Sequence, residues 1–285
     1  MIYILLPVHN RVDETRKFLS CLKEQTCGDY HLILVDDGCT DGTAEYAARE
    51  IRDITVLRGD GNLWWAGSLQ KARKHLLGRA DVSEDDIVLI ANDDITFGKD
   101  FLCTVQEEAR IFPQSLILAR CHDQTTHELL DKGMNIDWKS FSFASASAPD
   151  DINVLSTRGL FMTFRVFCAV GGFHPLLLPH YGSDYEFTHR AFKKGFHLAI
   201  AERAAVYLNR ETTGTRSIDY RIGLLQLLNN LFVSKRSTYN RLMWTIFILL
   251  SSDRQYIIRN LCRLYIDALA IVYQWAILRL RGERT

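Results

Sequence analysis

The chain has 285 residues, which is enough for one α/β domain, often as large as about 250 residues, and an appendage. Hydrophobic residues make up 47% of it and charged residues 24%, with five prolines, which excludes a long disordered or low-complexity segment. The net charge is zero, and no nucleic-acid partner is predicted. Residues 216–285 nevertheless hold eleven Lys or Arg against four Asp or Glu, a net charge of +7, so residues 1–215 carry −7.

The cysteines and the N-terminus bear on the compartment of the protein. The seven cysteines are scattered and form no Cys-X-X-Cys motif, which indicates neither a disulfide framework nor a thiolate metal site and fits a reducing cytoplasm. The N-terminal MIYILLPVHN has no basic n-region, so it is interpreted as a buried strand and not as a signal peptide. The cysteines are Cys21, Cys27, Cys39, Cys103, Cys121, Cys168 and Cys262.

Apolar runs alternate with stretches of helical spacing along the first part of the chain. The predicted strands are Ile2–Leu6, His31–Val35, Ile54–Leu57, Ile87–Ala91 and the shorter Leu116–Ala119. The predicted helices are Glu14–Glu24, Gly42–Ile51, Gly67–Gly78 and Phe101–Phe112. This order predicts a doubly wound, mainly parallel sheet with its ligand site at the carboxyl ends of the strands.

The segment Phe141–Asp151 is rich in Ser, Ala, Pro and Asp and is predicted to be a loop. We expect a nucleotide-binding half in residues 1–115 and an acceptor-binding half in residues 116–215.

The triplet Asn92-Asp93-Asp94 directly follows a predicted strand. Carboxylate and amide oxygens in this position can bind a hard divalent ion that bridges a diphosphate. A turn held by side-chain hydrogen bonds is the alternative for a short cluster of Asn and Asp.

A second acidic cluster, Val35–Thr43, follows a strand and opens a helix. Asp36 or Asp37 can accept the imide N–H of a uracil or thymine, while Thr40 or Asp41 can cap the helix. No Gly-X-Gly-X-X-Gly follows the first strand, so phosphate binding of the dinucleotide type is not predicted.

Five motifs occur in a fixed order over about the first 210 residues. They are PVHNR at Pro7–Arg11, VDDGCTDGT at Val35–Thr43, the triplet at 92–94, RGLFMTFRVFCAVGGF at Arg158–Phe173 and SDYEFTHRAFKKG at Ser183–Gly195. Together they resemble the inverting family 2 glycosyltransferases with the GT-A fold. The resemblance implies an α/β, Rossmann-like nucleotide-diphospho-sugar transferase domain over residues 1–215 and a nucleoside-diphosphate sugar as donor.

The resemblance also assigns residues to the donor site. It implies that the nucleotide sugar contacts Pro7, Val8, His9, Asn10, Asp36 or Asp37, and Asp93. Asp94 would hold Mg²⁺ or Mn²⁺ against the diphosphate, with Asn92 standing as a weaker ligand where the family has an aspartate.

Asp184 matches the family's general base, which takes a proton from the acceptor hydroxyl, and Ser183 replaces the acid that precedes it. Capping of the following helix is the alternative for Asp184. The acceptor side is expected to include His180 and Tyr181, with a packed histidine as the alternative. Glu186 and Arg190 are expected there too, although an ion pair along one helix explains them as well.

The segment Gly59–Gly67 places Trp64 and Trp65 after a glycine-rich turn. It resembles a subset of the family assigned to rhamnosyl transfer in bacterial surface polysaccharides, which puts Asn62 and Trp65 at the sugar; burial in the core is the alternative for the tryptophans. Many family members carry a late histidine where this chain has Leu208-Asn209, and Asn209 or Thr213 is the candidate for its contact.

The basic tail, residues 216–285, contains the apolar stretches Leu242–Leu250 and Leu264–Leu278. Neither reaches the ~20 apolar residues needed to span a bilayer. Interleaved arginines and aromatics predict helices that lie on the inner face of the cell membrane, attracted by anionic headgroups. A helical cap or a homodimer interface is the alternative.

These features predict a metal-dependent inverting glycosyltransferase that moves a sugar from a UDP- or dTDP-linked donor, such as dTDP-rhamnose. The acceptor is expected to be a hydroxyl of a glycan or lipid-linked molecule in bacterial surface polysaccharide synthesis. A nucleotidyltransferase would need a glycine-rich basic loop after the first strand, which PVHNR is not. The remaining alternative is a non-catalytic, sugar-nucleotide-binding membrane scaffold, because Asn92 and Ser183 depart from active-site motifs.

Overall fold

The computed structural model describes residues 1–208 and 218–281. Its strands are β1 (Ile2–Val8), β2 (Tyr30–Asp36), β3 (Ile54–Arg58), β4 (Ile87–Ile90), β5 (Ile95–Phe97), β6 (Ser115–Asp123), β7 (Leu129–Asp131), β8 (Met134–Asp137), β9 (Ser142–Ser145), β10 (Leu160–Thr163) and β11 (His197–Leu208). Its helices are α1 (Val12–Lys23), α2 (Thr43–Glu50), α3 (Trp64–Leu77), α4 (Phe101–Ile111), α5 (Phe164–Val170), α6 (Ser183–Lys193), α7 (Leu224–Phe232), α8 (Arg241–Ser251) and α9 (Ile257–Leu280).

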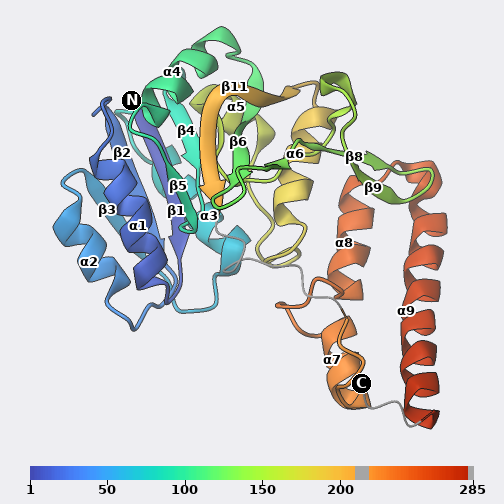
Figure 1. Cartoon of the computed structure of the whole chain (residues 1–285). Helices are drawn as coiled ribbons and strands as arrows, with labels where there is room; N and C mark the ends of the chain where they lie inside the picture. Colours follow the sequence, from blue (N-terminus) through green and yellow to red (C-terminus); the bar gives the residue numbers. More distant parts are fainter. Residues whose placement is uncertain (209–217, 282–285) are drawn as a thin grey trace.

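One curled sheet with the order β3-β2-β1-β4-β10-β6-β11-β5 forms the centre of the molecule (Figure 1). The five predicted strands and four predicted helices are present, and the α/β fold class is confirmed. The prediction of a mainly parallel sheet holds for the first four strands, but β10 runs antiparallel to both β4 and β6, and β5 runs antiparallel to β11. The sheet is therefore mixed in its second half.

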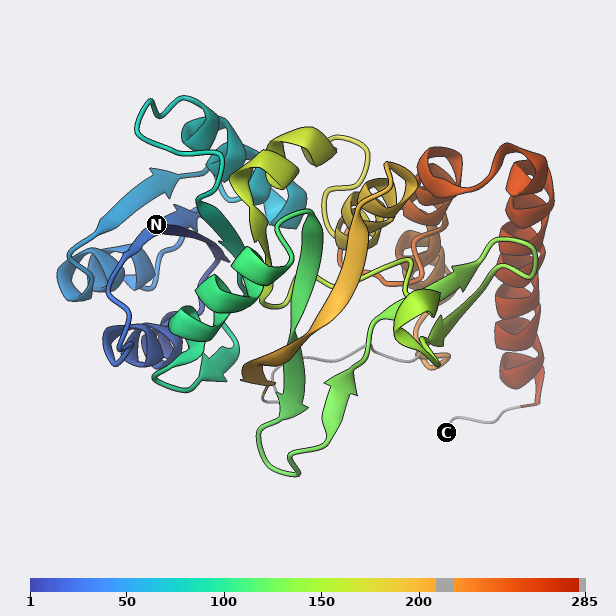
Figure 2. The same ribbon diagram turned by 90° about the horizontal axis from the view of Figure 1, so that it is seen from above.

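Alternating side chains of each strand supply two separate cores. On β1, Ile2, Ile4 and Leu6 pack with α1, α2 and α4, whereas Tyr3 and Leu5 face α3, α5 and α6. Both faces of the sheet are thus covered by helices (Figure 2). This burial explains why the strands are near-continuous apolar runs.

Strand order reverses beside β1, which pairs with β2 on one side and β4 on the other. Crossovers leave in opposite directions at such a point and open a crevice at the carboxyl ends of the strands. The polar residues after β1, β2 and β4 meet at this crevice.

The prediction of a loop over Phe141–Asp151 was wrong for its first part. Residues 142–145 form β9, which pairs with β8 as a hairpin, and Pro149–Asp151 form a short 3-10 helix. The alternation of Phe141 and Phe143 with serines has the period of a strand, and these rings pack against Trp138 and Phe247. The prediction of a loop gives more weight to the composition of this segment than to its two-residue period.

The tail helices α8 and α9 run side by side and pack on the β8–β9 hairpin, which lies between the sheet and α9 in Figure 2. Asn260 donates a hydrogen bond of 3.0 Å to the carbonyl of Trp138, and the buried guanidinium of Arg241 pairs with Asp267. The tail is therefore docked on the domain, as expected of a helical cap. It also leaves a large apolar face exposed.

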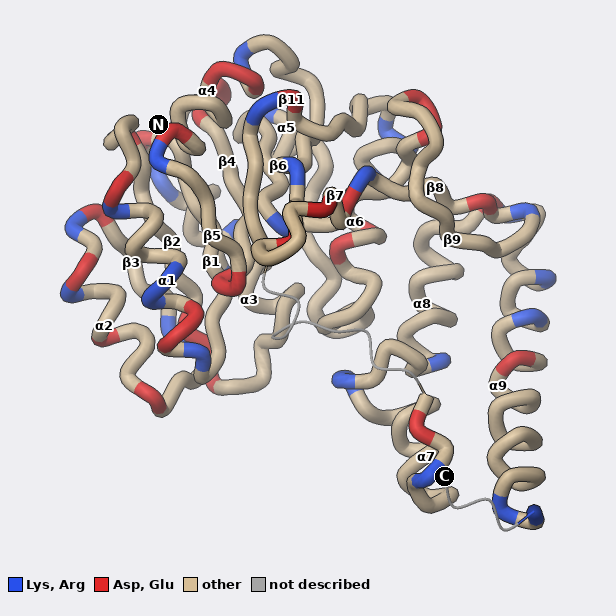
Figure 3. The backbone as a smooth tube through the Cα atoms, viewed as in Figure 1, with Lys and Arg blue, Asp and Glu red and all other residues tan. Residues whose placement is uncertain are grey.

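The prediction that no tail stretch could span a bilayer is corrected by the length of α9. With the turn before it, Arg254–Leu280 forms one continuous helical segment that is long and apolar enough, by length and composition, to cross a membrane, and only 17% of its apolar window is buried. The charged residues that interrupt the sequence do not interrupt the helix. Figure 3 shows basic residues toward both ends of α9, an acidic residue between them, and an uncharged stretch from this acidic residue to the C-terminal end.

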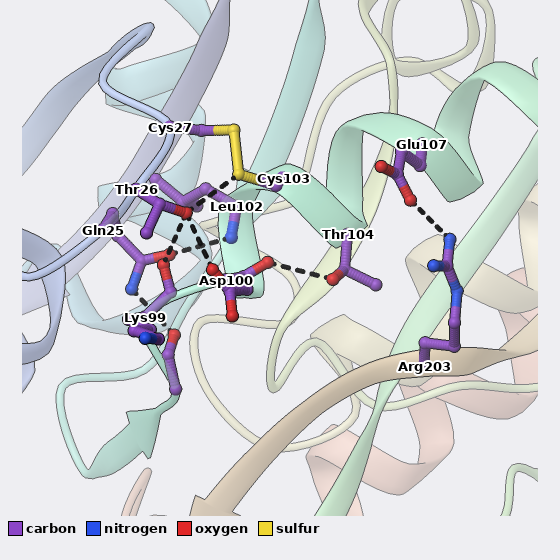
Figure 4. Close-up of a disulfide and its surroundings, with 11 residues drawn as sticks. Gln25, Thr26, Cys27, Lys99, Asp100, Leu102, Cys103, Thr104, Glu107 and Arg203 are labelled. Atoms are coloured by element: carbon purple, nitrogen blue, oxygen red, sulfur yellow. Dashed lines mark hydrogen bonds and ion pairs between the residues drawn. A yellow bond between two sulfur atoms is a disulfide. The ribbon is translucent and has the colours of Figure 1, made fainter.

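The cysteine pattern gave no sign of the disulfide between Cys27 and Cys103 (Figure 4). Gln25 and Thr26, which follow α1, hydrogen-bond the backbone of Gly98, Lys99 and Leu102, so the two cysteines meet although 76 residues separate them. The interpretation of the cysteines as unpaired was wrong for these two because the pairing depends on tertiary contacts.

Reducing this disulfide is expected to lower the free energy of unfolding. A cross-link that closes a loop of this size contributes at most about 4 kcal/mol through the entropy of the unfolded chain. Urea unfolding with and without reductant measures the effect, and Cys262→Ser, at an exposed free cysteine, is the matched control. Equal unfolding midpoints, with all seven thiols titratable without reductant, would rule the disulfide out.

Candidate active site

A cleft with a volume of about 1160 Å³ opens at the carboxyl ends of β1 and β4. One wall of the cleft is formed by the residues after β1, β2 and β4, by the start of α3 and by the segment before α6. The other wall is formed by the tail. Predicted site residues in the lining are Pro7, Val8, His9, Asp37, Trp65, Asn92, Asp93, Asp94, His180 and Tyr181. Ten residues chosen from sequence are thus brought to one cleft.

Asp37 organises the loop that begins α3. Its carboxylate accepts hydrogen bonds from the backbone N–H groups of Gly61 (2.9 Å), Leu63 (3.0 Å) and Trp64 (2.9 Å). Trp64 has a φ of 57°, which is rare for a residue with a side chain and is held here by these contacts. Asp37 therefore fixes one wall of the cleft through the backbone.

Asp36 is fully buried behind this wall and is outside the described lining of the cleft. Its carboxylate accepts from the Cys39 N–H at 2.7 Å and from the Arg58 guanidinium at 2.6 Å. The structure gives it internal partners, and its predicted contact with a nucleobase stays a prediction.

His9 and Asn10 tie β1 to the acidic loop after β2. The His9 ring lies 2.6 Å from the carbonyl of Asp37, and the Asn10 side chain accepts from the Thr40 N–H at 2.8 Å. His9 lines the cleft, whereas Asn10 lies in a small neighbouring depression. Only His9 of these two is placed to meet a ligand in the main cleft.

Arg11, which the motif PVHNR contains but the site assignment omitted, joins the acidic triplet. Its guanidinium lies 3.5 Å from Asp93 Oδ1 and 3.5 Å from Asp94 Oδ2. Burial raises the pKa of Asp93 to about 7, with Arg11 opposing and Asp94 adding to that rise. One cation thus holds two buried carboxylates together.

The other oxygens of the triplet have no hydrogen-bond partner within residues 1–208 and 218–281. Asn92 Oδ1, Asp93 Oδ2 and Asp94 Oδ1 are all buried. Buried polar atoms are normally paired, and hard oxygen donors suit Mg²⁺ or Mn²⁺. No cluster of three His, Cys, Asp or Glu with metal-binding geometry exists in the described chain, so a divalent ion here would need oxygens from water or a diphosphate. The donor set fits such an ion.

Asp184 is the second residue of α6 and is partly buried; it is outside the described lining of the cleft, three residues after Tyr181, which lines it. Burial raises its pKa to about 6, and the Arg158 guanidinium acts in the opposite direction. Arg158 lines the cleft and also interacts electrostatically with Asp94 and with Asp131 on β7. A carboxylate with this pKa is largely ionised at neutral pH and still able to accept a proton.

The sequence model described as Glycosyl transferase family 2 matches residues 3–164, more than half of the chain. The chain belongs to this family. Membership places it among the glycosyl transferases. No curated protein sequence matches the chain.

Solved glycosyltransferases share the fold of this family 2 chain. Staphylococcus aureus TarS is 15% identical with a TM-score of 0.55, over 87% of this chain and 42% of that protein. TarS 1-349 in complex with UDP-GlcNAc is 14% identical with a TM-score of 0.57, over 87% and 71%. GalNAc-T7 with UDP, GalNAc and Mn²⁺ is 12% identical with a TM-score of 0.60, over 73% and 43%. The transferase therefore spans less than half of full TarS, and the likeness concerns the fold alone.

Glu186 and Arg190 of the transferase form an ion pair on α6, at 2.8 Å, away from the described cleft lining. Arg190 also donates to the carbonyls of Val170 and Gly172. These contacts hold the turn after α5 against α6. The alternative of a helix-face pair accounts for them, and contact with an acceptor is an untested prediction.

Trp64 and His180 face each other at the mouth of the cleft, with ring centroids 5.6 Å apart. Asn62 lies outside the described lining and accepts from Trp64 Nε1 at 2.8 Å. Burial, with Arg236 next, lowers the pKa of His180 to about 4, so His180 is neutral at pH 7. Asn62 thus helps to position Trp64, and its predicted contact with the sugar stays a prediction.

Sequence reasoning missed several residues of the cleft. Arg11 and Arg158 stand within quoted motifs and were open to prediction, whereas the wall formed by the tail was not, because it is distant in sequence. Asn209 and Thr213, the candidates for a late contact, lie outside the described residues. Missed lining residues include Arg11, Gly61, Trp64, Ser68, Arg158, Gln226, Asn230 and Arg236.

Proposed function

We propose that this family 2 transferase moves a sugar from a UDP- or dTDP-linked donor to a hydroxyl of a lipid-linked glycan acceptor, with inversion at the anomeric carbon. The observation that carries the proposal is the convergence of the Asn92–Asp94 triplet, Asp37, His9 and the surroundings of Asp184 on one cleft. The cleft exceeds the usual size of a small-ligand pocket, about 300–1,000 Å³, which leaves room for donor and acceptor together.

Asp184 is assigned as the base in this proposal. It accepts the proton of the acceptor hydroxyl while the oxygen attacks the anomeric carbon and the bond to the nucleotide breaks on the opposite face. Arg158 favours the ionised form of Asp184 and so keeps it able to accept that proton. The leaving diphosphate departs toward the triplet.

Asp94 and Asn92, with the free oxygen of Asp93, would hold Mg²⁺ or Mn²⁺. A bound ion supplies charge stabilisation for the departing diphosphate. Arg11 bridges Asp93 and Asp94 and limits their mutual repulsion. Solved structures with this fold contain UDP, UDP-GlcNAc or UDP with Mn²⁺, which supports this donor class and ion type.

We assign dTDP-rhamnose as the first donor to test, on the segment Gly59–Gly67, and bacterial surface polysaccharide synthesis as the setting. Thermal-shift screening against UDP-, dTDP- and GDP-sugars with Mg²⁺ or Mn²⁺ tests the donor class, because a ligand that binds only the folded protein raises its melting temperature. A shift with GDP-sugars alone would overturn the assignment.

We further propose that the tail attaches the enzyme to the cytoplasmic face of the cell membrane. The outer face of α9 exposes large apolar side chains, such as Ile266 (64% exposed), Leu269 (71%) and Tyr273 (69%). Arg259 and Arg263 donate to carbonyls of the β8–β9 hairpin turn, so they hold α9 on the domain and leave its apolar face outward. Spanning the membrane would break these contacts, which favours a peripheral helix.

The double variant Ile266→Glu with Leu269→Glu is expected to sediment with phosphatidylglycerol-containing vesicles at least about tenfold less than the wild type. Each apolar side chain that becomes buried in the bilayer contributes about 1.5–3 kcal/mol to binding. Binding should persist in high salt, since apolar contacts are not screened. Ile111→Glu, at an exposed apolar site on α4, is the matched control.

Equal binding of the wild type and the double variant would reject the membrane proposal. A wild-type dimer that becomes monomeric in the double variant would assign this face to the homodimer instead.

A second candidate function is a non-catalytic scaffold that binds sugar nucleotides. It is supported by Asn92 and Ser183, which depart from the active-site motifs. The buried, titratable Asp184 favours the enzyme over the scaffold. Slow hydrolysis of the donor by the purified protein separates the two, because a scaffold would bind the donor and release no nucleoside diphosphate.

A further inference from the structure

Two cations of the tail contact the start of α3 at the cleft: Arg236 is in the lining of the cleft, and its neighbour Lys235 is outside that lining. Lys235 and Arg236 belong to the connection between α7 and α8. The ammonium of Lys235 is 3.3 Å from Asn62 Oδ1 and 5.6 Å from the centre of the Trp64 ring, and the Arg236 guanidinium carbon is 5.9 Å from the same ring. The tail therefore contacts the start of α3 through Trp64, the residue with a positive φ.

Within residues 1–208 and 218–281, these cations lack the acidic partners that Arg11 and Arg221 have. Among described residues, no carboxylate lies within 4.0 Å of either one, whereas Arg11 pairs with Asp93 and Asp94 and Arg221 pairs with Asp219. His180 beside them stays neutral. Arg236 and the hydroxyls of Ser234 and Ser237 line the same wall, and Lys235 adjoins them outside the lining. The nearest acid of this wall, Asp219, pairs with Arg221, so the two cations are suited to bind an anion.

The anion site lies on the side of the predicted base. His180, which Arg236 adjoins, precedes Asp184 by four residues, and Tyr181 also lines this part of the cleft. The donor diphosphate has separate partners in Arg11 and the triplet at 92–94. The charges of Lys235 and Arg236 are therefore available to the second substrate.

Apolar side chains continue from this point along the tail wall. Ile218, Ile222 and Tyr239 line the cleft together with Leu227 and Leu231 of α7. Outside this lining, α7 also exposes Leu225 (84%). An acceptor that meets both features carries a phosphate next to a hydrocarbon chain.

We propose that Lys235 and Arg236 bind the phosphate of a lipid phosphate-linked acceptor, with its hydrocarbon chain along α7. This inference rests on the proposed transferase function and specifies its second substrate. The docked tail then has two roles: it exposes the apolar face for the membrane, and it binds the phosphate of a substrate that is itself in the membrane.

The test uses the full chain and a double variant, Lys235→Gln with Arg236→Gln, which removes both charges and keeps side-chain length. Arg254→Gln, at an exposed tail arginine, is the matched control. The probes are farnesyl phosphate, farnesol and inorganic phosphate, measured by titration calorimetry, and UDP with Mn²⁺ as a separate titration. Circular dichroism melting confirms that the variants are folded.

We expect the double variant to bind farnesyl phosphate about 10- to 100-fold more weakly, as for the loss of hydrogen bonds to a charged group. Farnesol should bind the wild type more weakly than farnesyl phosphate, and equally in both proteins. Tight binding of inorganic phosphate without benefit from the farnesyl chain would assign the site to a free anion and overturn the lipid part.

Loss of UDP binding in the double variant, with farnesyl phosphate unaffected, would assign the cations to the donor and overturn the proposal. Failure of the transferase function has a different signature, because the wild type would then release no nucleoside diphosphate from any donor whatever the binding of farnesyl phosphate.

Discussion

Replacement of Asp184 with asparagine is expected to lower kcat by about 10²–10⁴-fold, the range for loss of a positioned general base. Asparagine keeps the size of the side chain and its place at the start of α6, so donor binding should be unchanged. Release of nucleoside diphosphate and calorimetric donor titration measure the two quantities separately. The loss should fall on kcat because the base acts only after both substrates are bound.

The pH dependence of the wild type gives an independent check on Asp184. Because burial raises the pKa of Asp184 from 3.8 to about 6, the base is protonated below that pH, and kcat should fall as the pH drops through 6. Arg158→Gln should move this acid limb to higher pH, since Arg158 lowers the pKa of Asp184.

The ionised form of Asp184, which catalysis needs, is expected to lower the stability of the folded protein. The folded protein binds the Asp184 proton more tightly than the unfolded chain does, so the contribution of Asp184 to stability falls as the pH rises from about 4 to 6. Asp184→Asn should therefore be as stable as the wild type at pH 7, or more stable.

Near wild-type turnover in Asp184→Asn would contradict the assignment of Asp184 and would show that another group is the base.

Asp94→Asn is expected to remove metal-dependent donor binding. The substitution deletes one of two carboxylates in the triplet and leaves Arg11 with Asp93, so the site loses charge while the fold is kept. Mn²⁺ should strengthen UDP binding to the wild type at least about tenfold, as one charge-assisted contact is worth about 1.5–3 kcal/mol, and should have little effect in the variant.

The matched control for Asp94 is Asp41→Asn, because Asp41 is an acidic residue of the neighbouring loop that accepts hydrogen bonds from Val12 and Thr43 and has none with the triplet. It should keep the response to Mn²⁺. If EDTA leaves UDP affinity and turnover of the wild type unaltered, the transferase does not use a divalent ion, and Arg11 and Arg158 are then the positive groups near the triplet.

Local patterns in the sequence predicted the fold where local structure decides it. The apolar strands and the polar residues after β1, β2 and β4 were identified because both core faces bury alternating side chains and because parallel strands gather their carboxyl ends. The β8–β9 hairpin was missed because its composition resembles a loop, although Phe141 and Phe143 had the spacing of a strand.

The part of the site that sequence reasoning missed depends on contacts between distant segments. The hydrogen bond from Lys235 to Asn62 spans 173 residues, and no local period or motif marks either partner. The disulfide between Cys27 and Cys103 depends in the same way on the packing of the α1 end against α4. Asp131, which reaches the surroundings of Arg158 through the pairing of β7 with β6, is a third example.

Proton NMR distinguishes inversion from retention in the sugar that is released or transferred when the purified full chain is incubated with UDP- and dTDP-sugars and Mn²⁺. We expect release of nucleoside diphosphate, first formation of the product with the anomeric configuration opposite to that of the donor, and loss of both signals in Asp184→Asn. A product that retains the donor configuration would contradict the inverting mechanism. Donor binding without any release of nucleoside diphosphate would contradict the enzyme and leave the scaffold.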